Sequence, residues 1–100
     1  MLNIEEYKLL INDLCQNRPV KRLDLFGSSL TDSFSVNSDV DVLVVFDADK
    51  TNDYFNHYFD LKENLEKIFN RSVDLVINRK FKNPYFQKVI DRTRKIIYER

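Results

Sequence analysis

The chain has 100 residues, no net formal charge and a hydrophobic fraction of 43%, which is enough for a single core and too little for a second domain. Its 13% aromatic content excludes a disordered chain. The sequence shows neither an apolar run of transmembrane length nor a secretory leader, and the single Cys15 excludes an internal disulfide. We therefore expect one cytoplasmic domain over residues 1–100, with no membrane contact.

The neutral total hides an uneven distribution of charge. Residues 1–70 contain 7 Lys and Arg against 13 Asp and Glu, whereas residues 71–100 contain 9 against 3. A basic end attracts a triphosphate, an RNA or an acidic partner, and a solvated helix face has the same composition. The sequence alone leaves these readings open.

The chain begins with a pattern typical of an amphipathic helix. Asn3 is placed as a cap, with Glu6 three residues later in a capping-box arrangement. The helix is expected to end near Asn17, before Arg18-Pro19. Its apolar stripe consists of Ile4, Tyr7, Leu10, Ile11, Leu14 and Cys15.

Two strands and a short helix are expected next. Arg22 to Phe26 reads as a short strand, residues 28–34 as a short helix and residues 35–38 as a polar loop. Residues 39–46 predict a central strand covered on both faces, because β-branched residues fill both of its faces after the two aspartates.

The second half of the chain continues the alternation of helix and strand. Residues 54–69 predict a long amphipathic helix that buries Tyr54, Tyr58, Leu61, Leu65 and Ile68. Val73 to Ile77 predicts a third strand with Asp74 and Val76 on one face.

A last helix is expected to open at Asn83-Pro84, with Tyr85, Phe86, Val89 and Ile90 as its buried stripe. Lys95 to Tyr98 fits either a helical extension or an edge strand. The order α-β-α-β-α-β-α predicts an α/β (α+β) fold: a small mixed sheet of three to four strands flanked by helices.

Gly27-Ser28, followed after ten residues by Asp39-Val40-Asp41, is the motif that carries chemistry. Glycine allows a sharp turn and a close approach of the backbone to a phosphate, and a helix opening at Ser28 would direct N–H groups at it. Residues two apart on a strand share a face, so Asp39 and Asp41 offer oxygen ligands suited to Mg²⁺ at one place.

Asp74 is the third carboxylate of the expected site. It is second in a strand that should pair with or neighbour the 39–46 strand. Three converging carboxylates repel one another unless a divalent cation compensates them. Asp24, two residues before Phe26, either adds a fourth carboxylate or forms a salt bridge with Lys or Arg.

These residues resemble the signature of the DNA polymerase β-type nucleotidyltransferase superfamily, and within it the minimal nucleotidyltransferases, the antitoxin-like partners of HEPN-domain toxins. The likeness rests on Leu25-Phe26-Gly27-Ser28, on Asp39-Val40-Asp41-Val42-Leu43-Val44 and on Val73-Asp74-Leu75-Val76, and it covers nearly the whole chain.

The resemblance implies a role for each matching residue. Gly27 and Ser28 would bind the terminal phosphates of the nucleotide. Asp39 and Asp41 would bind two Mg²⁺ ions, and Asp74 would complete the catalytic metal site and help to deprotonate the acceptor. It further implies transfer of AMP from ATP to a hydroxyl, most simply a tyrosine of a HEPN toxin, which is thereby silenced.

Two departures from the family pattern bear on activity. Family members often have Arg at position 29 and Gly at position 32, where this chain has Ser29 and Asp32. A binding-only antitoxin is therefore kept as an alternative, and the basic end of the chain keeps an RNA-directed transferase as another. The sequence leaves open the acceptor, the nucleotide and the choice between a homo-oligomer and a hetero-oligomer with the toxin.

Overall fold

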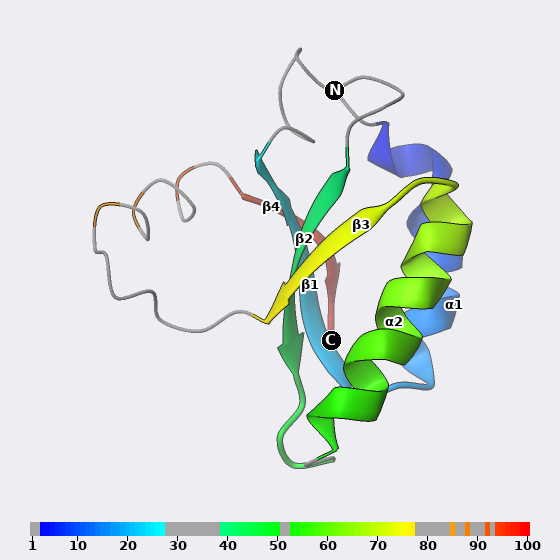
Figure 1. Cartoon of the computed structure of the whole chain (residues 1–100), viewed down its shortest axis with the longest axis vertical. Helices are drawn as coiled ribbons and strands as arrows, with labels where there is room; N and C mark the ends of the chain where they lie inside the picture. Colours follow the sequence, from blue (N-terminus) through cyan, green and yellow to red (C-terminus); the bar gives the residue numbers. More distant parts are fainter. Residues whose placement is uncertain are drawn as a thin grey trace.

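The chain forms a twisted four-stranded sheet with two helices packed against one of its faces (Figure 1). The computed structural model describes residues 3–27, 39–50, 53–77 and 94–100, and Tyr85, Lys88 and Arg92 singly. The strand order is β3-β2-β1-β4. The strands are β1 (Val20–Phe26), β2 (Val40–Phe46), β3 (Val73–Ile77) and β4 (Lys95–Glu99).

Strand pairing makes the sheet mixed, as the sequence predicts. Strand β2 pairs antiparallel with β1 and parallel with β3, and β4 lies antiparallel to the other side of β1. Residues 95–98 therefore belong to an edge strand and not to a helix. Strand β1 begins two residues earlier than predicted, because Val20 pairs with Phe46 and the Asp47 N–H donates to the Pro19 carbonyl.

The first helical region differs in detail from its prediction. A 3-10 turn, η1 (Ile4–Glu6), precedes helix α1 (Lys8–Gln16). The prediction of a capping box is wrong. The Asn3 side-chain amide donates to the Glu6 carboxylate and makes no capping hydrogen bond to the backbone. Leu10 is 54% exposed and lies outside the buried stripe, whereas Cys15 is fully buried, as expected. Burial raises the pKa of the Cys15 thiol to about 12, so the thiol stays protonated and acts as a core side chain.

Helix α2 (Tyr54–Phe69) has the predicted boundaries. It begins where Asp53 accepts hydrogen bonds from the side-chain amide and the backbone N–H of Asn56. These contacts, first the one from the side chain, lower the pKa of Asp53. It ends at Asn70, whose φ of 54° is in the left-handed region that stops helices. The prediction that Tyr54 is buried is wrong, since it is 39% exposed, although its ring stacks on Phe46.

Helix α2 also covers the outer edge of β3. The Tyr58 hydroxyl donates to the Leu75 carbonyl at 2.6 Å, and the Glu66 carboxylate accepts from the Val73 N–H at 3.1 Å. An edge strand otherwise leaves such groups open to pairing with another chain. These side chains therefore occupy two backbone groups of the β3 edge and link α2 to it.

The hydrophobic core lies between the helices and one face of the sheet. Helix α1 packs near β4 and α2 near β3. The core residues share the face of the sheet that the helices cover, or the inner sides of those helices; among them are Ile11, Leu14, Leu23, Leu25, Val42, Val44, Leu61, Leu65 and Leu75. Alternation then places Asp24, Asp41 and Asp74 on the other face, which we call the second face.

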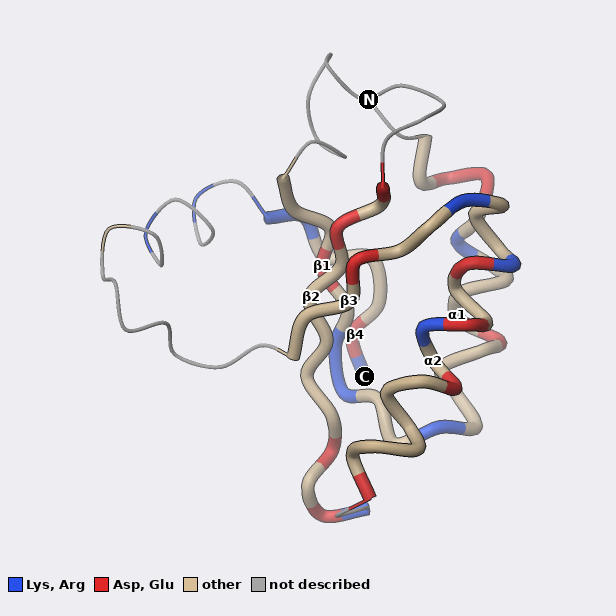
Figure 2. The backbone as a smooth tube through the Cα atoms, in the orientation of Figure 1, with Lys and Arg blue, Asp and Glu red and all other residues tan. Residues whose placement is uncertain are grey.

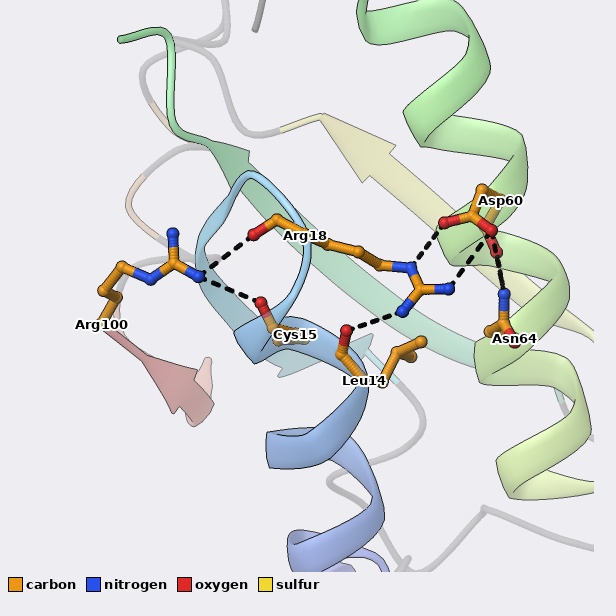
Figure 3. A network of polar contacts seen from close by, with 6 residues as sticks. All are labelled: Leu14, Cys15, Arg18, Asp60, Asn64 and Arg100. Atoms are coloured by element: carbon orange, nitrogen blue, oxygen red, sulfur yellow. Dashed lines mark hydrogen bonds and ion pairs between the residues drawn. The ribbon is translucent and has the colours of Figure 1, made fainter. Parts of the chain in front are cut away.

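Two arginines bind the end of α1 to the rest of the fold (Figure 3). Arg18 forms a two-point ion pair with Asp60 of α2, with Nε–Oδ2 at 2.6 Å and Nη2–Oδ1 at 3.4 Å, and donates to the Leu14 carbonyl. The Arg100 guanidinium donates to the carbonyls of Cys15, Gln16 and Arg18. These bonds satisfy carbonyls that the end of a helix leaves without partners.

The Arg18–Asp60 ion pair should make the free energy of unfolding depend on pH in the acid range. Hydrogen bonding to Arg18 lowers the pKa of Asp60. The contribution of this ion pair to the free energy of unfolding is therefore complete above the ordinary Asp pKa of about 3.9. It is lost as pH falls through the lowered pKa of Asp60 in the folded chain. Arg18→Gln should lower the free energy of unfolding by about 1 kcal/mol at pH 7 and by less at pH 3. Urea unfolding of this variant and of the exposed control Lys8→Gln at both pH values checks it; an equal loss at both would contradict it.

Several predicted features lie outside the described residues. They are the helix over 28–34, the loop over 35–38, most of the last helix with Phe86, Val89 and Ile90, and the residues Ser28, Ser29 and Asp32. Tyr85, Lys88 and Arg92 are helical and exposed. The expected burial of Tyr85 is thus wrong, at 76% exposure. Within the described ranges, no helix is long and apolar enough to cross a membrane.

Candidate active site

Gly27 directly follows strand β1 in a conformation that suits glycine and few other residues. Its φ is +65°, in the left-handed region. A Cβ atom built on Gly27 would lie 2.4 Å from Oδ2 of Asp41, well inside contact distance. The bare glycine therefore creates the space that the Asp41 carboxylate occupies.

Asp41 and Asp74 lie opposite each other on neighbouring strands. They are register partners in the parallel β2–β3 pair, so both side chains are on the second face, and Figure 2 shows acidic segments side by side where β2 and β3 begin. Asp41 is half-buried and Asp74 is exposed. Like charges placed directly opposite destabilise a sheet, and oxygen ligands in this arrangement suit a divalent cation.

Asp39 stands just before β2 and is exposed. It is two residues from Asp41, which places both on the same side of extended backbone. The described residues contain no group of three or more His, Cys, Asp and Glu side chains that could hold a metal ion as they stand. The structure thus places Asp41 directly opposite Asp74, and Asp39 just outside the sheet. A metal site with all three ligands stays a prediction, as does the role of Ser28.

Asp24 is buried on the second face and forms ion pairs with two arginines. Its Oδ1 is 2.9 Å from Nε of Arg22, and its Oδ2 is 3.3 Å from Nε of Arg94. The hydrogen bond from Arg22 to Asp24 raises the pKa of that guanidinium. The sequence offered a salt bridge as one of two readings, and the structure confirms it.

A histidine and two exposed phenylalanines of α2 lie away from Asp41 and Asp74. His57 is half-buried on α2, near Arg18, Pro19 and Lys50. Phe55 and Phe59 are 73% and 47% exposed and line an apolar hollow with Ile77. This hollow adjoins the last residue of β3, whereas Asp74 is near the start of that strand.

Two comparisons of sequence identify relatives over most of the chain. The model of a family described as "Nucleotidyltransferase domain" matches residues 7–98. "Putative protein adenylyltransferase MJ1379" of Methanocaldococcus jannaschii is 36% identical over 90 residues, which cover 88% of this chain and 84% of the relative. "Putative protein adenylyltransferase MJ0128" of the same organism is 39% identical over 72 residues, 72% of this chain and 70% of the relative.

Solved structures share the fold. A double-mutant form of the toxin–antitoxin pair MntA–HpeT contains a chain with a TM-score of 0.66 and 21% identity, and the match covers 99% of this chain and 75% of that one. A toxin–antitoxin structure with AMP-PNP matches with the same TM-score and coverage at 22% identity. At this identity the likeness concerns the fold, while the family match covers the sequence from Tyr7 to Tyr98. The chain therefore belongs to the nucleotidyltransferase domain family.

Proposed function

We propose that this nucleotidyltransferase transfers AMP from ATP to a tyrosine hydroxyl of a HEPN-domain toxin and thereby acts as its antitoxin. The in-register pair of Asp41 and Asp74, with Gly27 pressed against Asp41, is the observation that carries the proposal. Two relatives named as adenylyltransferases of proteins favour a protein acceptor, and neighbours in fold come from toxin–antitoxin complexes, one with AMP-PNP.

The carboxylate chemistry of these residues suits a magnesium-dependent site, and Asp41 and Asp74 already lie opposite each other. Asp39, Asp41 and Asp74 would hold two Mg²⁺ ions, since carboxylate oxygens are the ligands that Mg²⁺ prefers. Bound metal would neutralise charge on the triphosphate and polarise its α-phosphate. Because Gly27 has no side chain, the Asp41 carboxylate lies directly against its backbone, beside the turn that would bind the leaving phosphates.

The transfer then follows from positioning and proton removal. The acceptor oxygen forms a bond to the α-phosphorus while the bond from that phosphorus to the bridging oxygen of pyrophosphate breaks. Asp74 would accept the hydroxyl proton, because it is exposed and faces Asp41 across one strand spacing. Gly27 and Ser28 would bind the leaving phosphates, as the motif implies.

Labelled ATP tests the proposal. The chain is incubated with Mg²⁺, ATP labelled at the α-phosphate, and a HEPN-domain toxin. We expect label on the toxin, none on a variant toxin with its acceptor tyrosine changed to phenylalanine, and none with Asp39→Asn plus Asp41→Asn in this chain.

The two alternatives predict other results. Label in RNA would instead favour an RNA-directed transferase, a role the basic end keeps open. Neutralisation of the toxin that survives the double replacement without any label would favour an antitoxin that works by binding alone. The cytoplasmic location and the oligomeric state with the toxin also remain part of the proposal, and sedimentation of the co-expressed pair would measure the latter.

A further inference from the structure

Asp24 is a buried carboxylate with no place in the metal chemistry proposed above. It lies in the middle of β1 at 2% exposure, and its two oxygens face the Nε atoms of Arg22 and Arg94. A buried carboxylate is costly unless it is paired and hydrogen-bonded. Asp24 therefore holds both guanidiniums on the second face by ion pairs.

The arginines differ in their distance from the candidate active site. Arg22 pairs with Val45 near the end of β2, and its Nη1 is also 3.6 Å from the Glu99 carboxylate. Arg94 directly precedes Lys95, which pairs with Leu25. The backbone of Arg94 thus lies beside Phe26, the register partner of Asp41.

Strand spacing gives the scale of this arrangement. Two spacings, about 10 Å, separate the backbone of Arg94 from that of Asp41. Asp24 pairs with Leu43, so Asp24 and Asp41 are diagonal neighbours on one face, at about 7–8 Å. Arg94 is consequently the arginine of this pair on the Asp41 side.

We propose that Arg94 binds a phosphate of the nucleotide and that Asp24 is the positioning residue that holds its guanidinium in place. This inference rests on the proposed function. A guanidinium is a planar fork of N–H donors that matches the geometry of phosphate, and the ion pair with Asp24 orients this fork. A guanidinium that is already oriented loses little conformational entropy when it binds phosphate.

Charge on the second face supports the assignment. Asp24, Asp41 and Asp74 share that face, and a nucleoside triphosphate brings further negative charge. A cation fixed by Asp24 beside these groups offsets the repulsion that the substrate would meet. Arg94 retains 22% side-chain exposure, against 2% for Asp24, so of the two it is the one that solvent and ligand can reach.

Calorimetric titration with AMP-PNP and with adenosine, both in the presence of Mg²⁺, tests the assignment. Arg94→Gln should weaken AMP-PNP binding about tenfold, equivalent to about 1.4 kcal/mol, and leave adenosine binding within about twofold. Asp24→Asn should weaken AMP-PNP binding similarly, and Arg94→Lys should restore part of the affinity. Lys95→Gln is the matched control, since it removes the same charge from the next residue, whose backbone partner Leu25 is on the core face.

Two results would overturn the assignment: AMP-PNP affinity unchanged in a folded Arg94→Gln chain, or an equal loss for AMP-PNP and adenosine, which marks a structural role. If Asp24→Asn does not fold, the two Arg94 variants decide the matter. The unmodified chain separates this inference from the proposed function. If it binds no AMP-PNP, both fall; if it binds and transfers label while Arg94→Gln does so equally well, only the assignment of Arg94 falls.

Discussion

Replacing Asp41 with asparagine is expected to abolish nucleotide transfer and leave the fold intact. Asparagine has nearly the same shape, so the packing against Gly27 is kept while the charge that would bind metal is lost. The rate of label transfer should fall by at least about 10³-fold, which corresponds to about 4 kcal/mol in the barrier. Asp74→Asn should act in the same direction.

Thermal unfolding distinguishes this loss from a loss of structure. Asp41 and Asp74 are opposed like charges in the sheet, and removing one relieves repulsion, so the midpoint of unfolding should stay the same or rise. Asp49→Asn is the matched control because this exposed aspartate follows the opposite end of β2 and should transfer label at the normal rate. Undiminished transfer by the Asp41→Asn chain would exclude Asp41 from the chemistry.

Gly27→Ala is expected to lower the rate of nucleotide transfer nearly as much as Asp41→Asn, for a steric reason. The added methyl carbon would meet Asp41 Oδ2 at 2.4 Å, so the carboxylate or the turn must move. A shift of about 1 Å in a reacting group costs on the order of 100-fold in rate. Alanine at a φ of +65° also costs about 1–2 kcal/mol of stability.

Asn70→Ala separates the two effects of that substitution. Asn70 is the other described residue with a positive φ, at 54°, and it is the C-cap of α2 and none of the residues assigned to the candidate active site. Urea unfolding should show a loss of stability in both variants, smaller in Asn70→Ala because asparagine already has a Cβ atom, whereas label transfer should fall only in Gly27→Ala. Equal transfer rates in the two variants would show that the space beside Asp41 is unimportant.

For helix α2 and strand β3, local sequence patterns were enough to predict where each element begins and ends. Helix α2 and strand β3 have the predicted limits, because a 3.6-residue apolar stripe and a short β-branched run carry their own information. Leu10 shows where this fails. It has helical spacing, but the width of a buried stripe depends on what packs against the helix.

The sequence predicted which residues form the candidate site, but not how the strands that hold them are aligned. The sequence indicated that Asp74 lies on a strand next to Asp41, which the structure confirms. Whether the two are directly opposite depends on strand alignment, which no local pattern encodes. The two partners of Asp24 illustrate the same limit, since one is two residues away and the other, Arg94, is seventy.

The way α2 covers β3 bears on how this protein can meet other chains. A small sheet usually offers two rims at which a foreign strand can be added. On one rim, Tyr58 and Glu66 already occupy backbone groups of Leu75 and Val73; on the other, β4 pairs with β1 through a register shift that interrupts a regular ladder. Growth of the sheet into fibrils or mixed sheets is thereby disfavoured at the β3 rim, where α2 occupies backbone groups, and at the irregular β4 rim.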